Sequence, residues 1–149
     1  MRKKLLWLAV PVILLICVLV FIQLQYPRKT FDDLLGVDEA KITKVLMRSG
    51  VTGKGVETSD SDKIKELISI LDNRHYRKAF NQELRTGYIY AYTFYSKSNE
   101  ILRIVGCGNN VHIYTYSEEK SSGKYYNVSK EIPLHLLDIW FNSLSRKGR

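Results

Sequence analysis

The feature that most constrains this chain is an uncharged run from Leu5 to Pro27, which is apolar as far as Ile22. A helix rises 1.5 Å per residue, so about 20 apolar residues cross a hydrocarbon core about 30 Å thick. Trp7 and Tyr26 lie near the ends of the run, where aromatic residues gather at membrane interfaces. The run therefore predicts an uncleaved transmembrane helix over residues 5–26, which would make the chain a single-pass membrane protein.

Two other interpretations of the run fit less well. A cleaved signal peptide has an apolar core of about 7–15 residues followed by a site with small residues, and no such site follows here. A lipid-modified cysteine would be Cys17, but that signal needs a small residue just before the cysteine, and Ile16 occupies the place. A signal anchor is the interpretation that we retain.

The flanking charges favour one orientation. Arg2, Lys3 and Lys4 precede the run, and the positive-inside bias places such a flank in the cytoplasm. Arg28 and Lys29 follow the run and oppose this, but a long C-terminal domain translocates largely regardless of its charge. We expect residues 1–4 to be a basic cytoplasmic flank, and the domain to lie outside the cell membrane.

The remainder of the chain suits one domain with a modest core. We expect residues 27–40 to be a linker with a short helix, and residues 41–149 to form an extracytoplasmic domain. The full chain has 26% charged residues and a formal net charge of +8, which is ordinary for a folded protein. Two cysteines are too few for a disulfide scaffold.

Hydrophobic periodicity predicts the fold class. Ile64, Leu67, Ile68 and Leu71 follow the spacing of an amphipathic helix, and a second helix is expected from Pro133 to about residue 146. Segments rich in strand formers lie between them, joined by short polar turns, at residues 88–95, 101–105, 111–116 and 124–128. We expect an α+β domain with a mostly antiparallel sheet and both helices packed on one face.

Tyrosines alternate along two of these segments. In a strand, residues two apart share a face, so the alternation predicts a common tyrosine face. Its members would be Tyr88, Tyr90, Tyr92, Tyr114 and Tyr116. Tyrosine is frequent in recognition surfaces, which favours a possible interaction face. The alternative is that half of these rings belong to the core and the rest only stiffen cross-strand pairs.

Basic residues gather between the predicted helix and the first tyrosine-rich strand. The possible basic patch consists of Arg74, Arg77, Lys78 and Arg85. Outside a cell, such a patch could bind anionic wall polymer or lipid headgroups. The alternative is a solvated surface. Nucleic acid is not an expected partner, because an exported domain rarely meets it.

No pattern in the sequence marks a catalytic, cofactor-binding or metal-binding residue. The glycine-rich turn at residues 50–55 lacks the spacing and the hydroxyl of a phosphate-binding loop. The three histidines lack metal-ligand spacing. Cys107 and His112 could form a nucleophile–base pair, but no third orienting group can be named. We expect a protein without a cofactor that is not an enzyme, with a cysteine-dependent enzyme as the less favoured alternative.

Four short segments carry a resemblance to a known group of proteins. They are Lys41-Ile-Thr43, the turn at residues 49–54, the helix Ile64–Leu71 and the strand Arg85–Tyr90. Over residues 40–145 the chain resembles small membrane-anchored extracytoplasmic proteins of Gram-positive bacteria whose function is unassigned. The resemblance implies an envelope location and no catalytic residues. We expect a non-enzymatic interaction module for an envelope partner, with binding of anionic wall polymer or lipid as the alternative.

Overall fold

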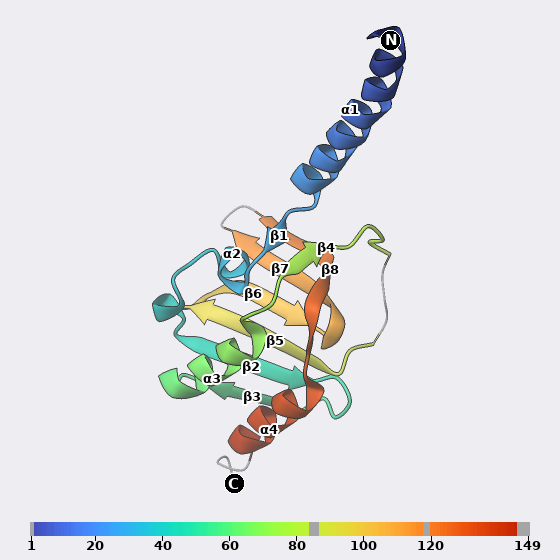
Figure 1. Ribbon diagram of the computed structural model, residues 1–149. Coiled ribbons are helices and arrows are strands. Elements are labelled where there is room, and N and C mark those ends of the chain that lie inside the picture. Colours follow the sequence, from blue (N-terminus) through green and yellow to red (C-terminus); the bar gives the residue numbers. More distant parts are fainter. Residues whose placement is uncertain (1, 84–86, 118–119, 146–149) are drawn as a thin grey trace.

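The computed structural model describes residues 2–83, 87–117 and 120–145, and the side chains of residues 2–9, 117, 120 and 121 are outside this description. One eight-stranded sheet organises the chain (Figure 1). Its strands are β1 (Arg28–Lys29), β2 (Lys44–Ser49), β3 (Gly55–Thr58), β4 (Tyr76–Lys78), β5 (Tyr90–Ser96), β6 (Asn99–Val105), β7 (Gly108–Ser117) and β8 (Lys120–Ile132). The helices are α1 (Arg2–Gln25), α2 (Phe31–Leu35), α3 (Ser61–Leu71) and α4 (Leu134–Ser145), with a 3-10 turn, η1, at Glu39–Lys41.

The strand order is β1-β4-β8-β7-β6-β5-β2-β3, and each of these neighbouring pairs is antiparallel. Strands β5 to β8 pair in chain order, each antiparallel to the next, and form a continuous meander. The link from β4 to β5, by contrast, passes from one side of that meander to the other. This makes the fold α+β, with a mostly antiparallel sheet.

The predicted transmembrane helix is wrong, because no helix in the described parts of the chain has both the length and the apolar character needed to cross a membrane. The single-pass and signal-anchor assignments are wrong with it, and the orientation inferred from the flanking charges loses its basis.

The helix α1 projects from the sheet domain rather than packing on it (Figure 1). Its attachment is at Tyr26, whose carbonyl oxygen accepts a hydrogen bond from Nε of Arg77 at 3.1 Å. The Tyr26 ring lies 4.3 Å from that of Phe80, measured between centroids. The next residues form β1, which pairs with β4 at the edge of the sheet.

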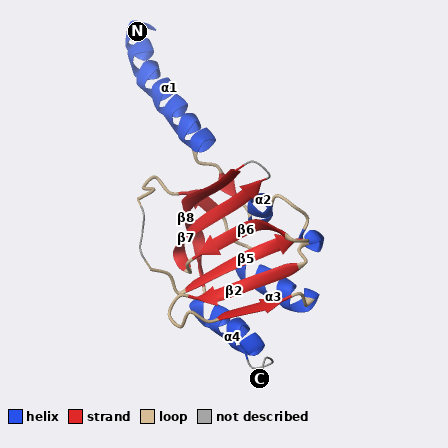
Figure 2. Ribbon diagram, turned by 180° about the vertical axis from the view of Figure 1, so that it is seen from behind, coloured by secondary structure: helices blue, strands red, loops and turns tan. Residues whose placement is uncertain are grey.

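Helices α2, α3 and α4 all cover the same face of the sheet, which lies in front of them in Figure 2. The core between the helices and the sheet includes Phe31 of α2, Leu67 of α3 and Trp140 of α4, each fully buried. The segment expected to be a linker thus contributes α2 to this core, where Phe31, Leu34 and Leu35 are buried.

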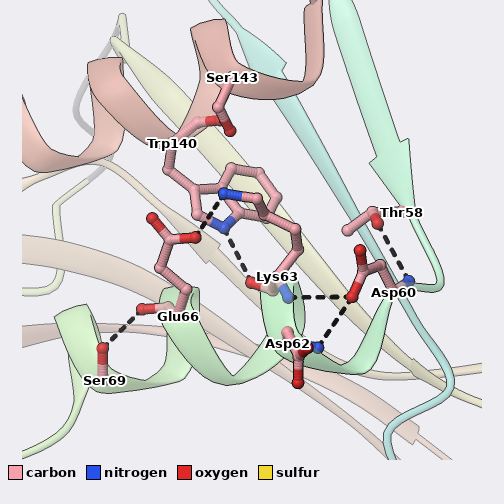
Figure 3. Close-up of polar contacts among 8 residues, drawn as sticks. All are labelled: Thr58, Asp60, Asp62, Lys63, Glu66, Ser69, Trp140 and Ser143. Atoms are coloured by element: carbon pink, nitrogen blue, oxygen red, sulfur yellow. Dashed lines mark hydrogen bonds and ion pairs between the residues drawn. The ribbon is translucent and has the colours of Figure 1, made fainter. Parts of the chain in front are cut away.

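The packing of α3 against α4 is fixed by polar contacts as well as by burial (Figure 3). The Asp60 carboxylate accepts hydrogen bonds from the backbone N–H groups of Asp62 at 2.9 Å and Lys63 at 3.4 Å, so it caps α3. The indole Nε1 of Trp140 donates to the carbonyl oxygen of Lys63 at 2.8 Å. A buried Trp N–H needs such a partner, and this one joins the two helices directly.

Candidate functional site: the hollow on the open face of the sheet

The two faces of the sheet are assigned by the register of its strands. Tyr92 on β5 pairs with Ile104 on β6, which pairs with Ile113 on β7, and all three face the helices and are buried. Residues one position away therefore face the other side. We call that side, which α2, α3 and α4 do not cover, the open face (Figure 2).

The structure divides the five predicted tyrosines between the two faces. Tyr90 and Tyr92 are in the core, with exposed fractions of 6% and 0%. Tyr114 and Tyr116 lie half-buried on the open face of β7. Tyr88 precedes β5 and is 40% exposed. The single tyrosine face that the sequence predicted is therefore not formed, because the alternation of β5 is out of phase with that of β7.

The buried pair of tyrosines has a structural role. The hydroxyl of Tyr90 donates to the Asp138 carboxylate on α4 at 2.6 Å. Burial, followed by this hydrogen bond and the charge of Asp138, raises the pKa of Tyr90 to about 12. The hydroxyl of Tyr92 donates to the carbonyl oxygen of Gly106 at 3.2 Å, and burial raises its pKa well above the ordinary value.

The three described members of the predicted basic patch are not all exposed on one surface. Arg74 is 8% exposed, and its guanidinium donates to the backbone carbonyls of Asp72, Lys130 and Glu131 as well as to that of Ile70. This arginine holds the end of α3 against β8. Arg77 and Lys78 are half-buried beside Tyr26. Arg85, the fourth predicted member, lies outside the described residues.

A hollow of about 530 Å³ lies on the open face, over β2, β5, β6, β7 and β8. Two rows of side chains line it, each row running across the strands. The first row is Arg48, Ala91, Val105, His112 and Tyr125. The second row is Leu46, Thr93, Arg103, Tyr114 and Gly123, of which Gly123 has no side chain. In the first row, the small side chains of Ala91 and Val105 lie between larger ones, so the floor of the hollow is lowest there.

Stacked rings form one wall of the hollow. The His112 ring lies 4.1 Å from that of Tyr125, nearly parallel to it, and 4.2 Å from that of Tyr114, between centroids. Burial lowers the pKa of His112, partly offset by a hydrogen bond with the Gly123 backbone, so the ring is neutral at pH 7. A Cβ on Gly123 would lie 2.6 Å from Tyr114 and 2.7 Å from His112. The glycine is what lets both rings lie against β8.

An ion pair between Arg103 and Glu100 borders the hollow. Nη2 of Arg103 lies 3.0 Å from each carboxylate oxygen of Glu100, and Nε of Arg103 donates to the Thr93 hydroxyl at 3.2 Å. The Tyr95 hydroxyl donates to the same carboxylate at 3.1 Å, and burial together with this hydrogen bond raises the pKa of Tyr95. The positive charge of Arg103 is thus matched within the protein.

The described parts of the segment between β4 and β5 border the hollow at two places, Gln82 beside Tyr125 and Gly87 to Ile89 beside Gly50. The side-chain amide of Gln82 accepts from the backbone N–H of Tyr125 at 2.9 Å and donates to its carbonyl oxygen at 3.1 Å. Further along the segment, Gly87 and Tyr88 line the hollow. The rim also exposes Ile89, at 38%.

Cys107 and His112 are not a catalytic pair in this arrangement. Cys107 packs against the core and its pKa is raised, first by burial and then by the charges of Glu131 and Asp138. A thiol with a raised pKa is a weaker nucleophile at neutral pH. His112 faces the open side, stacked between rings. Within the described residues, no group of three or more histidine, cysteine, aspartate or glutamate side chains could hold a metal ion.

Sequence reasoning missed most of the hollow. Arg48 and Leu46, the residues of β2 that line the hollow, are not among the predicted site residues. Tyr125 was assigned to a strand without a role. The missing signal is the register between strands, which no residue pattern within a single strand supplies.

Comparison with known proteins adds no relative. No protein-family model, no curated protein and no solved structure matches the chain.

Proposed function

We propose that this protein is a non-enzymatic binding module, and that it takes its partner in the hollow on the open face of the sheet. The observation that carries the proposal is the composition of the hollow. Stacked rings, a small apolar floor, an exposed arginine and an ion pair all border one concavity.

The size of the hollow supports the proposal. Its volume of about 530 Å³ lies within the range of roughly 300–1,000 Å³ that ligand-binding pockets occupy. Apolar floors with a few placed polar groups are typical of such pockets. On the helix-covered face, the corresponding side chains fill a core instead.

Binding without catalysis fits the chemistry of the lining better than an enzyme does. His112 is neutral and stacked, Glu100 is held by Arg103 and Tyr95, and Cys107 faces the core. These contacts leave no nucleophile–base pair among the described lining residues. Binding of anionic polymer through the predicted basic patch has less support, because Arg74 is committed to backbone carbonyls.

To test the proposal, a fragment library that contains acids, bases, amides and sugars is screened against the full chain by saturation-transfer NMR. Ala91→Phe places a ring over the floor of the hollow. The control is Lys124→Phe, which adds the same ring at an exposed position of β8. Lys124 pairs with Ile113, which faces the core, so it lies on the other side of the sheet from the hollow. We expect fragments that bind the wild type and the Lys124→Phe variant to lose binding in Ala91→Phe. Fragments that bind all three proteins equally would place binding elsewhere and contradict the proposal.

A further inference from the structure

The charges that line the hollow do not balance. Among the lining residues that the structure describes, the charged ones are Arg48, Glu100 and Arg103. Glu100 and Arg103 form a two-oxygen ion pair, with 3.0 Å from Nη2 to each oxygen. His112 adds no charge at pH 7, since burial lowers its pKa. The excess is one positive charge, and it belongs to Arg48, whose guanidinium stays protonated at all relevant pH values.

The neighbours of Arg48 leave its charge unmatched. Its register partners are Gly55 on β3 and Ala91 on β5, which offer no acid and little cover. Glu57 lies two residues further along β3, on the same face and opposite Leu46. Arg48 and Glu57, both of which the structure describes, form no ion pair with each other. Arg48 is exposed at one end of the hollow, with its planar donor fork available to an anion.

The opposite end of the same row is aromatic. Three strand spacings separate Arg48 from His112, which is about 14 Å across the sheet. Ala91 and Val105 lie between them and make a small apolar floor. An occupant that satisfies the whole row therefore has a negative group at one end and a flat apolar group at the other.

Exposed apolar surface continues past the hollow at its rim. Tyr88 and Ile89 expose apolar surface next to the hollow, at 40% and 38%. This surface extends the contact area beyond the concavity, as a partner chain that continues past its anchoring residues would require.

Resting on the proposed function, we propose that the hollow binds a segment of a partner protein in which a carboxylate side chain lies close to an aromatic one. Arg48 receives the carboxylate, and the aromatic ring lies on Ala91 and Val105 against His112 and Tyr114. Charge-assisted bonds from arginine to a carboxylate are often bidentate, which gives the site both affinity and direction.

The test uses two libraries of capped hexapeptides and the full chain. In the first, one glutamate and one phenylalanine are placed at every spacing in a glycine–serine background. In the second, glutamine replaces the glutamate, which removes the charge and keeps the shape. Saturation-transfer NMR identifies the binders, and calorimetry gives their affinities.

We expect at least one glutamate peptide to bind, and its glutamine twin to bind at least about tenfold more weakly, the effect of losing a hydrogen-bonded charge pair. Arg48→Gln should weaken the glutamate peptide to the level of its twin. Arg28→Gln, at an exposed arginine of the edge strand β1, should leave both affinities unchanged. Because Arg48 is exposed, the variant keeps the core intact, and circular dichroism confirms its folding.

Two results would overturn the inference. Equal binding of the twin peptides, or equal weakening of both by Arg48→Gln, would show that the hollow does not recognise a carboxylate. Absence of peptide binding, together with binding of the small acid 2-naphthoate, would show that the occupant is not a protein segment. Neither result touches the proposed function, which stands or falls on the loss of mixed-library binding in Ala91→Phe.

Discussion

The helix-covered face and the open face of the sheet carry the same residue types, but these residues have different roles on the two faces. On the covered face, Tyr92 is fully buried and its hydroxyl donates to a backbone carbonyl. On the open face, Tyr114 is half-buried and its ring lies against His112 and over Gly123. A tyrosine on the covered face therefore stabilises the fold, whereas one on the open face shapes a surface.

Arginine shows the same contrast. Arg74 is buried, and its guanidinium N–H groups donate to carbonyl oxygens at the end of α3 and on β8. Arg48 is exposed and has no acidic partner among the described residues. What decides the role of each residue is the direction in which the register points its side chain, together with what covers that side.

The sharpest way to break this comparison is to truncate a tyrosine on each face. Tyr92→Ala should lower the free energy of unfolding by about 3–5 kcal/mol, the usual cost of deleting a buried aromatic ring. Tyr114→Ala should lower it by about 1 kcal/mol or less, since its ring is partly solvated. Urea unfolding of the full chain measures both. Equal losses would contradict the assignment of the two faces.

The second comparison is between two arginines that the sequence placed in one patch. Arg74→Met should lower the free energy of unfolding by about 2–3 kcal/mol, because it leaves several buried carbonyl oxygens without donors. Arg77→Met removes the hydrogen bond to the Tyr26 carbonyl oxygen and should cost about 1 kcal/mol or less. If Arg77→Met proves the more costly variant, the structural role given to Arg74 is wrong.

A third prediction tests the ring wall itself. Gly123→Ala brings a Cβ into the space of the Tyr114 and His112 rings, which must move. Because both rings border the hollow and have room to shift, the cost should be about 1 kcal/mol. The more sensitive readout is the ring-current shift of the His112 protons in NMR spectra. An unchanged shift would show that the rings do not pack over the glycine.

The smallest expected effect concerns pH. The pKa of His112 is lowered from 6.5, first by burial, so protonation favours the unfolded chain. The stability that the neutral ring contributes is complete above about pH 6.5 and is lost as the pH falls through the lower pKa of the folded state. Between pH 7.5 and 5.0 the wild type should therefore lose more stability than His112→Gln. Parallel losses in urea unfolding would contradict this.

Local patterns in the sequence were sufficient for the elements and for much of the core. The spacing of Ile64, Leu67, Ile68 and Leu71 predicted α3, and all four are buried. The strands from β5 to β8 follow runs of strand formers and short turns. Such features depend on residues close together in the chain, so a single sequence reveals them.

The hollow could not be predicted in the same way, because it depends on which strands are neighbours and in which register. Tyr90 and Tyr114 both alternate with smaller residues, yet they lie on opposite faces. The pairing of β2 with β5, which brings Arg48 beside Ala91, joins segments more than 40 positions apart. One sequence carries no direct record of such pairings.

The measurement that tests the binding site most directly is a methyl NMR titration of the full chain, labelled at alanine, valine, leucine and isoleucine. The titrant is the strongest fragment or peptide from the screens. We predict the largest shift changes at the methyl groups of Leu46, Ala91 and Val105, which line the hollow. The largest changes at Leu136 and Ile139, which are exposed on α4, would place binding on that helix and contradict the proposed function.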